Sequence, residues 1–418
     1  MAGNSLTIPS FFKNRYRDHK NIIKIVSASI IAVFFTVYTA SAFSSGAKLF
    51  ATLFSNSASG DENYNQVYVI GLIVAAVVIL VYTFMGGFKA VCTTDLIQGL
   101  MMIVAILSVP VLAYAILTFD TSFSSALAAK GVEQPAQFLN FFVNGDGTPV
   151  SAVSIISNLA WGLGYFGMPH ILVRFMAVKS NEEIKKSRKI AVVWVIISLT
   201  ASCLIGLIAR GYLTAQLDDA TSESVFIRTI QQIFSGNGVL IFIGGIFLCG
   251  ILAAIMSTAD SQLLVTASAV SEDLYKGAVK KNASEKSSLL VGKIAVAVVA
   301  VIAFFIALNP KSSIMGLVSD AWAGFGSAFG PVVLLALFWK RSTLSGAISG
   351  MATGALTVII WDYIPLVNGQ TLYAATNLYS LVVGFGLALI VNVIVSLLSK
   401  KPSKEIMDEF DSIKNIEV

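Results

Sequence analysis

The stretch that decides the fold is WGLGYFGMPHILVRF, residues 161–175. It places Gly162, Gly164, Gly167 and Pro169 inside an apolar run. Glycine destabilises a helix and proline lacks a backbone N–H, so we predict a broken helix here. Irregular backbone at membrane depth is tolerated where it is buried in protein or lines a cavity, and its freed polar groups can then meet a substrate. A kink that serves only packing is the alternative, because both residue types are common in membrane helices.

The rest of the chain has the composition of a membrane protein. Of its 418 residues, 56% are hydrophobic and 12% are charged, and the mean hydropathy is +0.81. A soluble domain carries about twice this charge fraction, and a water-soluble core cannot absorb so much apolar surface. We therefore predict an all-α polytopic membrane protein. The net charge of +5 comes from basic loops between apolar runs, so it does not indicate a nucleic-acid partner.

Apolar runs long enough to cross a bilayer recur along the chain. A transmembrane helix needs roughly 20 apolar residues, and on this measure we predict about ten such helices. Their predicted starts are Ile22, Tyr68, Leu96, Val153, Ile190, Val239, Leu289, Met315, Leu344 and Leu372.

Charged residues alternate between the loops. Lys and Arg gather before the first predicted span, in the even-numbered loops and after the last span, whereas acidic residues mark the odd-numbered loops. By the positive-inside rule both chain ends are then cytoplasmic. We expect one transmembrane domain over residues 1–418, with a cytoplasmic N-terminal segment at 1–20 and a cytoplasmic tail at 399–418.

A second informative stretch is GILAAIMSTADSQLL, residues 250–264. Ala254, Ser257, Thr258 and Ser261 are spaced so that they share one face of a helix. Hydroxyls and carbonyl oxygens suit a hard cation such as Na⁺, and softer ligands are absent from this face. A contact between closely packed helices is the alternative, because small residues let helices approach one another.

Two carboxylates lie at or inside apolar runs, namely Asp95 and Asp260. An acid within a membrane is a functional-site hypothesis, since its burial is costly without a partner. Asp260 falls within the hydroxyl face, whereas Asp95 sits near a predicted cytoplasmic end and has an interfacial position as its alternative. Asp320 is also read as interfacial. The segment AWAGFGSAFGP at 321–331 alternates small residues with aromatics and is read mainly as tight helix packing.

Enzymatic motifs are missing from the sequence. It has no HExxH, no GxSxG, no P-loop and no GxGxxG that opens a helix after a strand. Three scattered cysteines and two histidines form no metal-ligand spacing and no disulfide framework. We therefore expect neither an enzyme nor a bound cofactor, and the lack of a soluble domain argues against a sensor or an ATP-driven transporter.

At these segments the sequence resembles the sodium:solute symporter family, and within it the proline-transporting branch. The match runs nearly end to end, and the run WGLGYFGxPH together with STxDSQLL and SEDLYK is specific. The stretches that carry the resemblance are FFTVYTASAFSSGAKLF at 34–50, YTFMGGFKAVCTTDLIQGLMM at 82–102, WGLGYFGMPHILVRFMA at 161–177, GILAAIMSTADSQLLVTASAVSEDLYK at 250–276 and LVSDAWAGFGSAFGPVVLL at 317–335.

The resemblance implies a LeuT-type fold of two inverted five-helix repeats, with broken helices at the repeat interface and binding sites near the midplane. It also implies a departure at the start of the chain. Relatives have about three further helices before the segment that matches TIPSFFKNRY. The second of these helices supplies backbone groups opposite Ser257 and Thr258. We therefore expect an incomplete fold, in which the first core helices are missing and the sodium site is half built.

The resemblance also assigns site residues by position. It implies that Ser257 and Thr258 hold a sodium ion through their hydroxyls, with help from the Ala254 carbonyl. Met168 stands where many proline symporters carry glutamine. The positions implied to line the substrate cavity are Tyr38, Trp161, Tyr165 and Pro169. The positions that surround a second sodium ion in some relatives are Asp95, Asp260 and Ser261.

The function implied is secondary active transport, in which Na⁺ is the coupling ion and L-proline enters a bacterial cell across its plasma membrane. Two alternatives stay open. The first is a non-transporting fragment of such a symporter. The second is a sodium symporter for another small solute, such as pantothenate, a sugar or sialic acid, because a scaffold alone does not name its substrate.

Overall fold

The computed structural model describes residues 5, 7–55, 61–85, 88–178, 180–219, 221–280 and 282–414. Residues 1–4 and 6 of the predicted N-terminal segment and 415–418 of the predicted tail lie outside this range, as do Gly86 and Gly87. The helices are α1 (Ile8–Tyr16), α2 (Ile22–Phe54), α3 (Glu62–Met85), α4 (Phe88–Asp120), α5 (Phe123–Ala129), α6 (Ala152–Gly164), α7 (Pro169–Met176), α8 (Asn181–Tyr212), α9 (Val225–Ile233), α10 (Gly238–Ser268), α11 (Glu285–Ala307), α12 (Ile314–Phe338), α13 (Leu344–Tyr363), α14 (Leu372–Thr376), α15 (Ser380–Leu398) and α16 (Lys404–Lys414).

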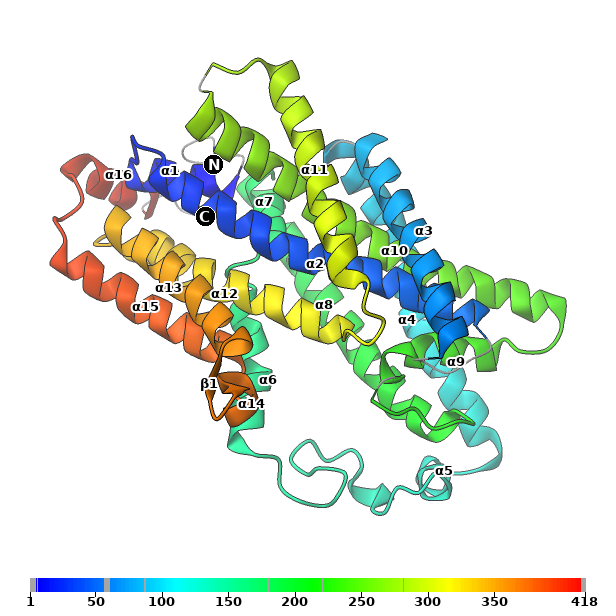
Figure 1. Ribbon diagram of the computed structural model, residues 1–418. Helices are drawn as coiled ribbons and strands as arrows, with labels where there is room; N and C mark the ends of the chain where they lie inside the picture. Colours follow the sequence, from blue (N-terminus) through cyan, green and yellow to red (C-terminus); the bar gives the residue numbers. More distant parts are fainter. Residues whose placement is uncertain are drawn as a thin grey trace.

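Shorter elements complete the chain (Figure 1). Two 3₁₀ turns are η1 (Pro135–Gln137) and η2 (Ser222–Ser224), and a π-helical segment, η3 (Ala269–Val279), continues α10. The strands β1 (Pro365–Val367) and β2 (Gln370–Thr371) form a small antiparallel hairpin between α13 and α14.

The protein is a multi-pass membrane protein. In the described part of the chain, nine helices are long and apolar enough to cross a bilayer: α2, α3, α4, α8, α10 with η3, α11, α12, α13 and α15. The remaining predicted span, which starts near Val153, is divided between the two short helices α6 and α7. The helix predicted to be broken is thus two helices in the structure.

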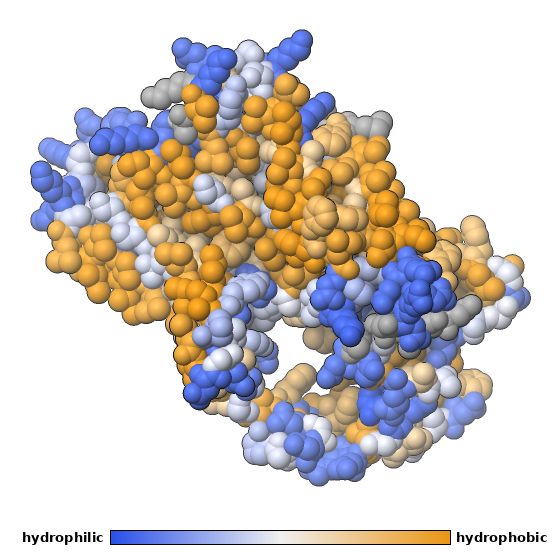
Figure 2. Space-filling model, in the orientation of Figure 1, coloured by the Kyte–Doolittle hydropathy of each residue, from blue (hydrophilic) through white to orange (hydrophobic). Residues whose placement is uncertain are grey.

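An apolar belt surrounds the bundle. Figure 2 shows hydrophobic side chains over the middle of the visible face and hydrophilic ones at its two ends. Exposed leucines and valines run along α4 and α8, for example Leu96, Val111 and Val193. A surface of this kind is far larger than the apolar patches that soluble monomers expose, and in a bilayer it contacts lipid tails.

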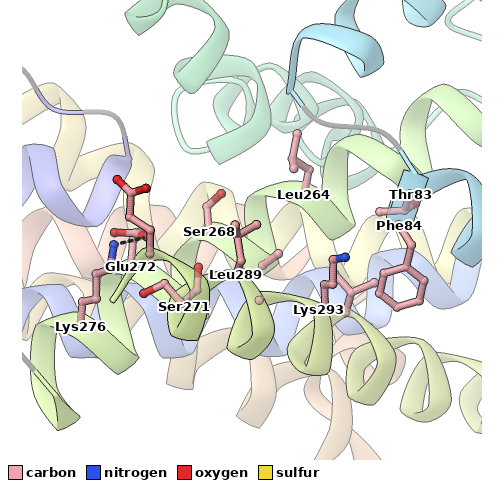
Figure 3. Close-up of a pocket in the computed structure, with 14 residues that line it drawn as sticks. Thr83, Phe84, Leu264, Ser268, Ser271, Glu272, Lys276, Leu289 and Lys293 are labelled. Carbon is pink, nitrogen blue, oxygen red and sulfur yellow. Dashed lines mark hydrogen bonds and ion pairs between the residues drawn. The ribbon is translucent and has the colours of Figure 1, made fainter. Parts of the chain in front are cut away.

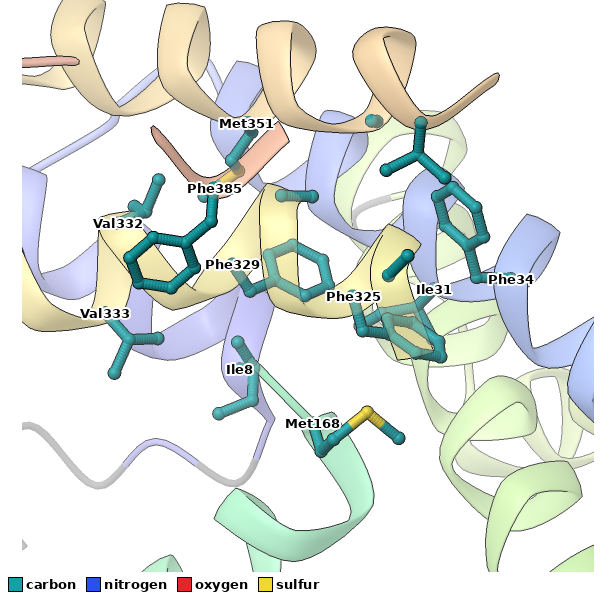
Figure 4. Packing of buried hydrophobic residues seen from close by; sticks show 14 of the residues in the cluster. Ile8, Ile31, Phe34, Met168, Phe325, Phe329, Val332, Val333, Met351 and Phe385 are labelled. Atoms are coloured by element: carbon teal, nitrogen blue, oxygen red, sulfur yellow. The ribbon is translucent and has the colours of Figure 1, made fainter. Parts of the chain in front are cut away.

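Helix α12 lies at the centre of the main core (Figure 4). Phe325 and Phe329 on α12 are fully buried, and the ring centroid of Phe325 is 4.5 Å from that of Phe35 on α2. Figure 4 shows this row of α12 side chains between residues of α1, α2, α13 and α15 and the chain around Met168. The α12 helix therefore positions the broken pair α6 and α7 against the rest of the bundle.

Small residues let α12 touch the break directly. A Cβ built on Gly326 would lie 2.9 Å from the Cα of Gly164, and one built on Gly167 would lie 2.3 Å from the carbonyl oxygen of Phe325. Real Cβ atoms do not approach this closely, so only glycine fits at these contacts. The alternation of small and aromatic residues at 321–331 has tight packing as its structural role.

The long helix α2 is anchored near its first turn. The Lys24 ammonium is 3.0 Å from Oδ1 of Asp273 on η3, whose side chain is fully buried. The same oxygen accepts hydrogen bonds from the hydroxyls of Thr7 and Ser10, each at 3.1 Å. These bonds join α1, α2 and η3 at one end of the bundle.

A second anchor lies near the other end of α2. The Lys48 ammonium is 2.6 Å from Oε2 of Glu223 on η2 and donates to the Ser312 carbonyl at 2.7 Å. Oε1 of Glu223 accepts from the Ser313 hydroxyl at 2.9 Å and from the backbone N–H of Met315 at 3.1 Å. Glu223 thus ties α2 to the first turn of α12.

The first and last helices lie side by side. Arg17, which follows α1, pairs with Glu409 on α16 at 2.7 Å, and the Arg15 guanidinium lies over the Phe410 ring at 5.1 Å from its centroid. Lys340 adds a pair to Asp411 at 3.2 Å. The two described ends of the chain are therefore on the same side of the bundle.

The glycine contact generates a prediction with an internal control. Gly164→Ala places a Cβ 1.9 Å from Nε1 of Trp322, so we expect a loss of about 1–3 kcal/mol of stability from overpacking. Gly162, on the same helix, has nothing within 4 Å of its built Cβ. Gly162→Ala should leave the melting temperature in detergent unchanged or raise it, since alanine favours a helix. Equal shifts for the two variants would contradict this packing.

Because of the Glu223 anchor, we expect the stability of the fold to depend on pH. Burial opposes ionisation of Glu223, but hydrogen bonds from Lys48 and from two backbone N–H groups outweigh it and hold its pKa below the usual 4.5. A carboxyl with a lowered pKa in the folded state stabilises the fold above its unfolded pKa, and this stabilisation is lost as the pH falls through the folded pKa. Wild type should therefore lose stability as the pH falls below 4.5.

The matched comparison uses Glu223→Gln and Asp219→Asn, an exposed carboxyl of the same loop. We expect Glu223→Gln to cost about 1.5–3 kcal/mol at neutral pH and to flatten the acid-side decline in melting temperature. Asp219→Asn should behave as wild type. A Glu223→Gln variant that keeps the full acid-side decline would refute the assignment of that decline to this anchor.

Candidate functional site

The break between α6 and α7 defines the candidate site. Helix α6 ends at Gly164, and the chain turns through bonds from the N–H groups of Phe166 and Gly167 to the carbonyls of Leu163 and Gly164, at 3.3 and 2.9 Å. Extended backbone at Met168 then leads into α7, whose first residue is Pro169. Proline suits this position because the first N–H groups of a helix have no intrahelical partner. The break thus presents one helix C-terminus and one helix N-terminus to the same region.

Aromatic rings gather at the α6 side of the break. Trp161 stacks on Tyr379 with ring centroids 5.5 Å apart, and it lies 5.9 Å from Trp322. Trp322 Nε1 donates to the Trp161 carbonyl at 2.9 Å. Tyr165 meets the edge of Trp322 at 4.9 Å. Trp161 and Tyr165, both named from sequence, are therefore brought together through Trp322.

Tyr38 lies on α2, on the α7 side of the break. Its ring is 6.3 Å from that of His170, the residue after Pro169, and Phe35 lies 5.8 Å from the same imidazole. Nδ1 of His170 is buried and has no hydrogen-bond partner in the described part of the chain. Of the four predicted cavity positions, Trp161 and Tyr165 therefore both contact Trp322, and Tyr38 lies beside His170, the residue that follows Pro169.

The hydroxyl face of α10 converges on one carbonyl. Ser257 Oγ and Thr258 Oγ1 both donate to the Ala254 carbonyl, at 3.2 and 2.9 Å. All three residues are half-buried. A cation that takes these hydroxyls as ligands needs only lone pairs on oxygen, which all three groups have. The structure therefore collects three oxygen atoms within about one helical turn.

Two carboxylates adjoin the hydroxyl face, Asp260 on α10 itself and Asp95 on α4. Asp260 is fully buried, and its Oδ2 has no partner among the described residues. Ser261 Oγ is 3.4 Å from Asp260 Oδ1 and 3.4 Å from Asp95 Oδ2, and it donates to the Ser257 carbonyl at 2.8 Å. The three positions named from sequence for a second ion are together, and they adjoin the hydroxyl face.

Arg174 completes this group. It lies in the last turn of α7, forms an ion pair with Asp95 on α4, and its Nη2 is 2.7 Å from Ser261 Oγ. Its guanidinium counters the Asp95 charge and connects α7 to α4 and α10.

Four residues at the site were not predicted: His170, Arg174, Trp322 and Tyr379. Three carried a usable signal. Trp322 stands in the segment of small and aromatic residues at 321–331, and His170 and Arg174 lie in the decisive stretch at 161–175. Tyr379 precedes a plain apolar span, and nothing in its local sequence marks it.

Comparisons with known proteins agree with this architecture. The sequence profile of the sodium:solute symporter family matches residues 1–354. The sodium/proline symporter of Staphylococcus aureus is 41% identical over 424 aligned residues, which cover 100% of this chain and 77% of that protein. The sodium/proline symporter 2 of Staphylococcus saprophyticus subsp. saprophyticus matches at the same identity and coverage.

One solved structure shares the fold. Its description is "Substrate-bound outward-open state of a Na+-coupled sialic acid symporter reveals a novel Na+-site". It superimposes with a TM-score of 0.67 over 95% of this chain and 78% of its own, at 18% sequence identity. This likeness confirms the predicted LeuT-type all-α architecture.

The Arg174 contacts generate a double-mutant prediction. Arg174→Gln leaves the mostly buried Asp95 carboxylate without its cation, so we expect a lower melting temperature. Asp95→Asn should recover part of that loss in the double variant, with an interaction free energy of about 0.5–3 kcal/mol. Arg188→Gln, an exposed arginine on α8, is the matched control and should melt as wild type. Strict additivity of the two single losses would show that the pair contributes nothing.

Proposed function

This chain belongs to the sodium:solute symporter family, and we propose that it is a secondary active transporter that carries L-proline into the cell together with sodium. The observation that carries this proposal is the 41% identity to sodium/proline symporters over the full length of the chain. These relatives are named as transporters, which agrees with the lack of enzymatic motifs in the sequence.

The proposal places one transmembrane transporter domain over residues 1–418 in the plasma membrane of a bacterium. Residues 1–20 and 399–418 are its cytoplasmic segments. The contact of Arg17 with Glu409 supports this arrangement, because it puts both described ends on one side. The basic even-numbered loops support that side as the cytoplasmic one.

Ala254, Ser257 and Thr258 are proposed to bind the coupling sodium ion. Their oxygens lie within one turn of α10, and the two hydroxyls now donate to a carbonyl that would itself turn toward the cation. Sodium is a hard cation without a need for nitrogen or sulfur ligands, so a hydroxyl and carbonyl set suits it.

Asp95, Asp260 and Ser261 are proposed as ligands of a second sodium ion. The unpartnered Oδ2 of Asp260 supports this role, because a buried carboxylate oxygen without a donor favours a nearby cation. Arg174 already neutralises Asp95. The ion would therefore approach from the Asp260 side of the group.

Proline is proposed to bind at the break, between Tyr38 and the residues Trp161, Tyr165 and Pro169. The aromatic rings on the α6 side offer an apolar wall for the pyrrolidine ring. The N-terminal end of α7 carries a partial positive charge, which favours the carboxylate of the amino acid.

Transport follows from coupling between these groups. Sodium bound to α10 favours the outward-open state, in which the substrate site is formed. Rocking of one helix group against the other then opens the site to the cytoplasm. A membrane potential contributes about 2.3 kcal/mol per 100 mV for each sodium charge that enters, so even one ion drives appreciable accumulation.

The test is uptake of labelled L-proline, with and without sodium, in cells that lack their own proline transporters. We expect uptake that requires sodium and is not reduced by an excess of pantothenate, a sugar or sialic acid. Uptake that does not depend on sodium would overturn the proposal. Sodium-dependent uptake of one of those competitors, without uptake of proline, would make that competitor the substrate in place of proline.

Substitutions on α10 distinguish the loss of a sodium ligand from a general loss of transport activity. Ser257→Ala and Thr258→Ala should each raise the sodium concentration for half-maximal uptake by about tenfold. This factor corresponds to the loss of one ligand that contributes about as much binding free energy as a hydrogen bond. Thr266→Ala is the control, because Thr266 also lies on α10 and also bonds a backbone carbonyl of its own helix, that of Gln262 at 2.8 Å. An equal shift in Thr266→Ala would remove the special role of Ser257 and Thr258.

A further inference from the structure

A pocket with a volume of about 410 Å³ lies away from the break (Figure 3). It is lined by η3 and the end of α10, by the first half of α11 and by the last turn of α3. None of the residues assigned above to sodium or to proline lines it. Its volume is in the range of small-molecule sites.

The two ends of the pocket differ in character. Phe84, in the last turn of α3, lies at one end together with Lys293 on α11. Glu285, in the first turn of α11, is about 12 Å nearer the start of that helix. Figure 3 shows Phe84 and Lys293 at one end of the pocket, the pair of Glu272 with Lys276 at the other, and serines between them.

Lys293 lies about two turns from the start of α11, and a lysine this near a helix end extends its ammonium along apolar surface toward the lipid headgroups. The exposed Lys293 has no ion pair in the described part of the chain. Lysine at a membrane boundary stands at the depth of lipid phosphates. Among the described residues, the ammonium of Lys293 is therefore a cation without a counter-charge that reaches toward the depth of lipid phosphates.

Serine hydroxyls line the same pocket. Ser288 is 3% exposed, lines the pocket, and its Oγ has no hydrogen-bond partner among the described residues. Ser271 Oγ would be 3.5 Å from a Cβ built on Gly292, the residue before Lys293. A buried hydroxyl without a partner is costly, and a phosphate oxygen would satisfy it.

The remaining charges at the pocket leave one anion at its outer end. Glu272 and Lys276 neutralise each other at 2.9 Å. Glu285 is exposed and has no ion pair in the described ranges. Read from the membrane outward, the pocket offers an apolar wall, a lysine with hydroxyls, and then a carboxylate.

We propose that this pocket binds the phosphoethanolamine headgroup of a membrane phospholipid. A phospholipid of this class has the same order as the pocket: acyl chains, then phosphate, then a primary ammonium. Lys293 with Ser288 would hold the phosphate through charge-assisted hydrogen bonds, and Glu285 would accept from the ammonium. A choline headgroup has no N–H to donate, and a glycerol headgroup has no cation, so both fit Glu285 less well.

The experiment measures lipid binding to the full chain in detergent micelles by native mass spectrometry. The probes are phosphatidylethanolamine, phosphatidylglycerol and phosphatidylcholine with identical acyl chains. We expect tighter binding of the ethanolamine lipid. Lys293→Gln and Ser288→Ala should each weaken its binding, the former by about tenfold. Glu285→Gln should abolish the preference over phosphatidylglycerol, and Lys286→Gln, an exposed lysine on the same helix, should change nothing.

Three outcomes would overturn the proposal. The first is equal binding of the three lipids by wild type. The second is an unchanged preference in Glu285→Gln together with unchanged affinity in Lys293→Gln, with both variants eluting as folded protein. The third is full competition by soluble O-phosphoethanolamine at the same concentration as the lipid, which would make the ligand a free solute. None of these readouts depends on transport, so failure here leaves the proposed symport untouched.

Discussion

The structure depends on one constraint, which is that backbone polar groups inside a bilayer must find partners within the protein. Helices satisfy it throughout the apolar belt, and the break at residues 164–169 is the costly exception. The protein accommodates this exception by covering it with α12. Gly326 brings the α12 backbone against Gly164, and Gly167 fits against the Phe325 carbonyl. This contact buries Gly164 and residues 167–169, whereas Tyr165 and Phe166 stay exposed.

Much of the architecture follows from the same requirement that polar groups within the bilayer have partners in the protein. Gly326 lies where α12 approaches the break, whereas Gly324 and Gly330 make room for the rings of Phe34 and Phe385. Charged side chains meet this requirement through ion pairs and hydrogen bonds. Lys24, Lys48 and Arg174 each meet a carboxylate and at least one further hydrogen-bonding group. These three ionised groups are thus each surrounded by several polar neighbours.

The elements predictable from sequence were those with a local signal. Glycine and proline spacing at 161–175 predicted the break, and the spacing of Ser257, Thr258 and Ser261 predicted a shared helical face. Pairings between distant segments carried no such signal. Asp95 meets Arg174 across 79 positions, and Thr7 meets Asp273 across 266. Local periodicity reports which face of a helix is polar, but tertiary packing alone decides which partner that face meets. For this reason the partners of His170, Arg174 and Tyr379 became known only with the structure.

The two anchors of α2 fix the number of residues between them. Lys24 and Lys48 are about 36 Å apart along the axis, slightly more than the roughly 30 Å of a hydrocarbon core. Each lysine therefore meets its partner just outside the hydrocarbon core of the bilayer. Adding or removing a single residue between them would rotate one lysine by about 100° relative to the other, so both pairs would no longer form together. Homologous chains that keep both anchors are thus free to vary the side chains of this helix but not its length.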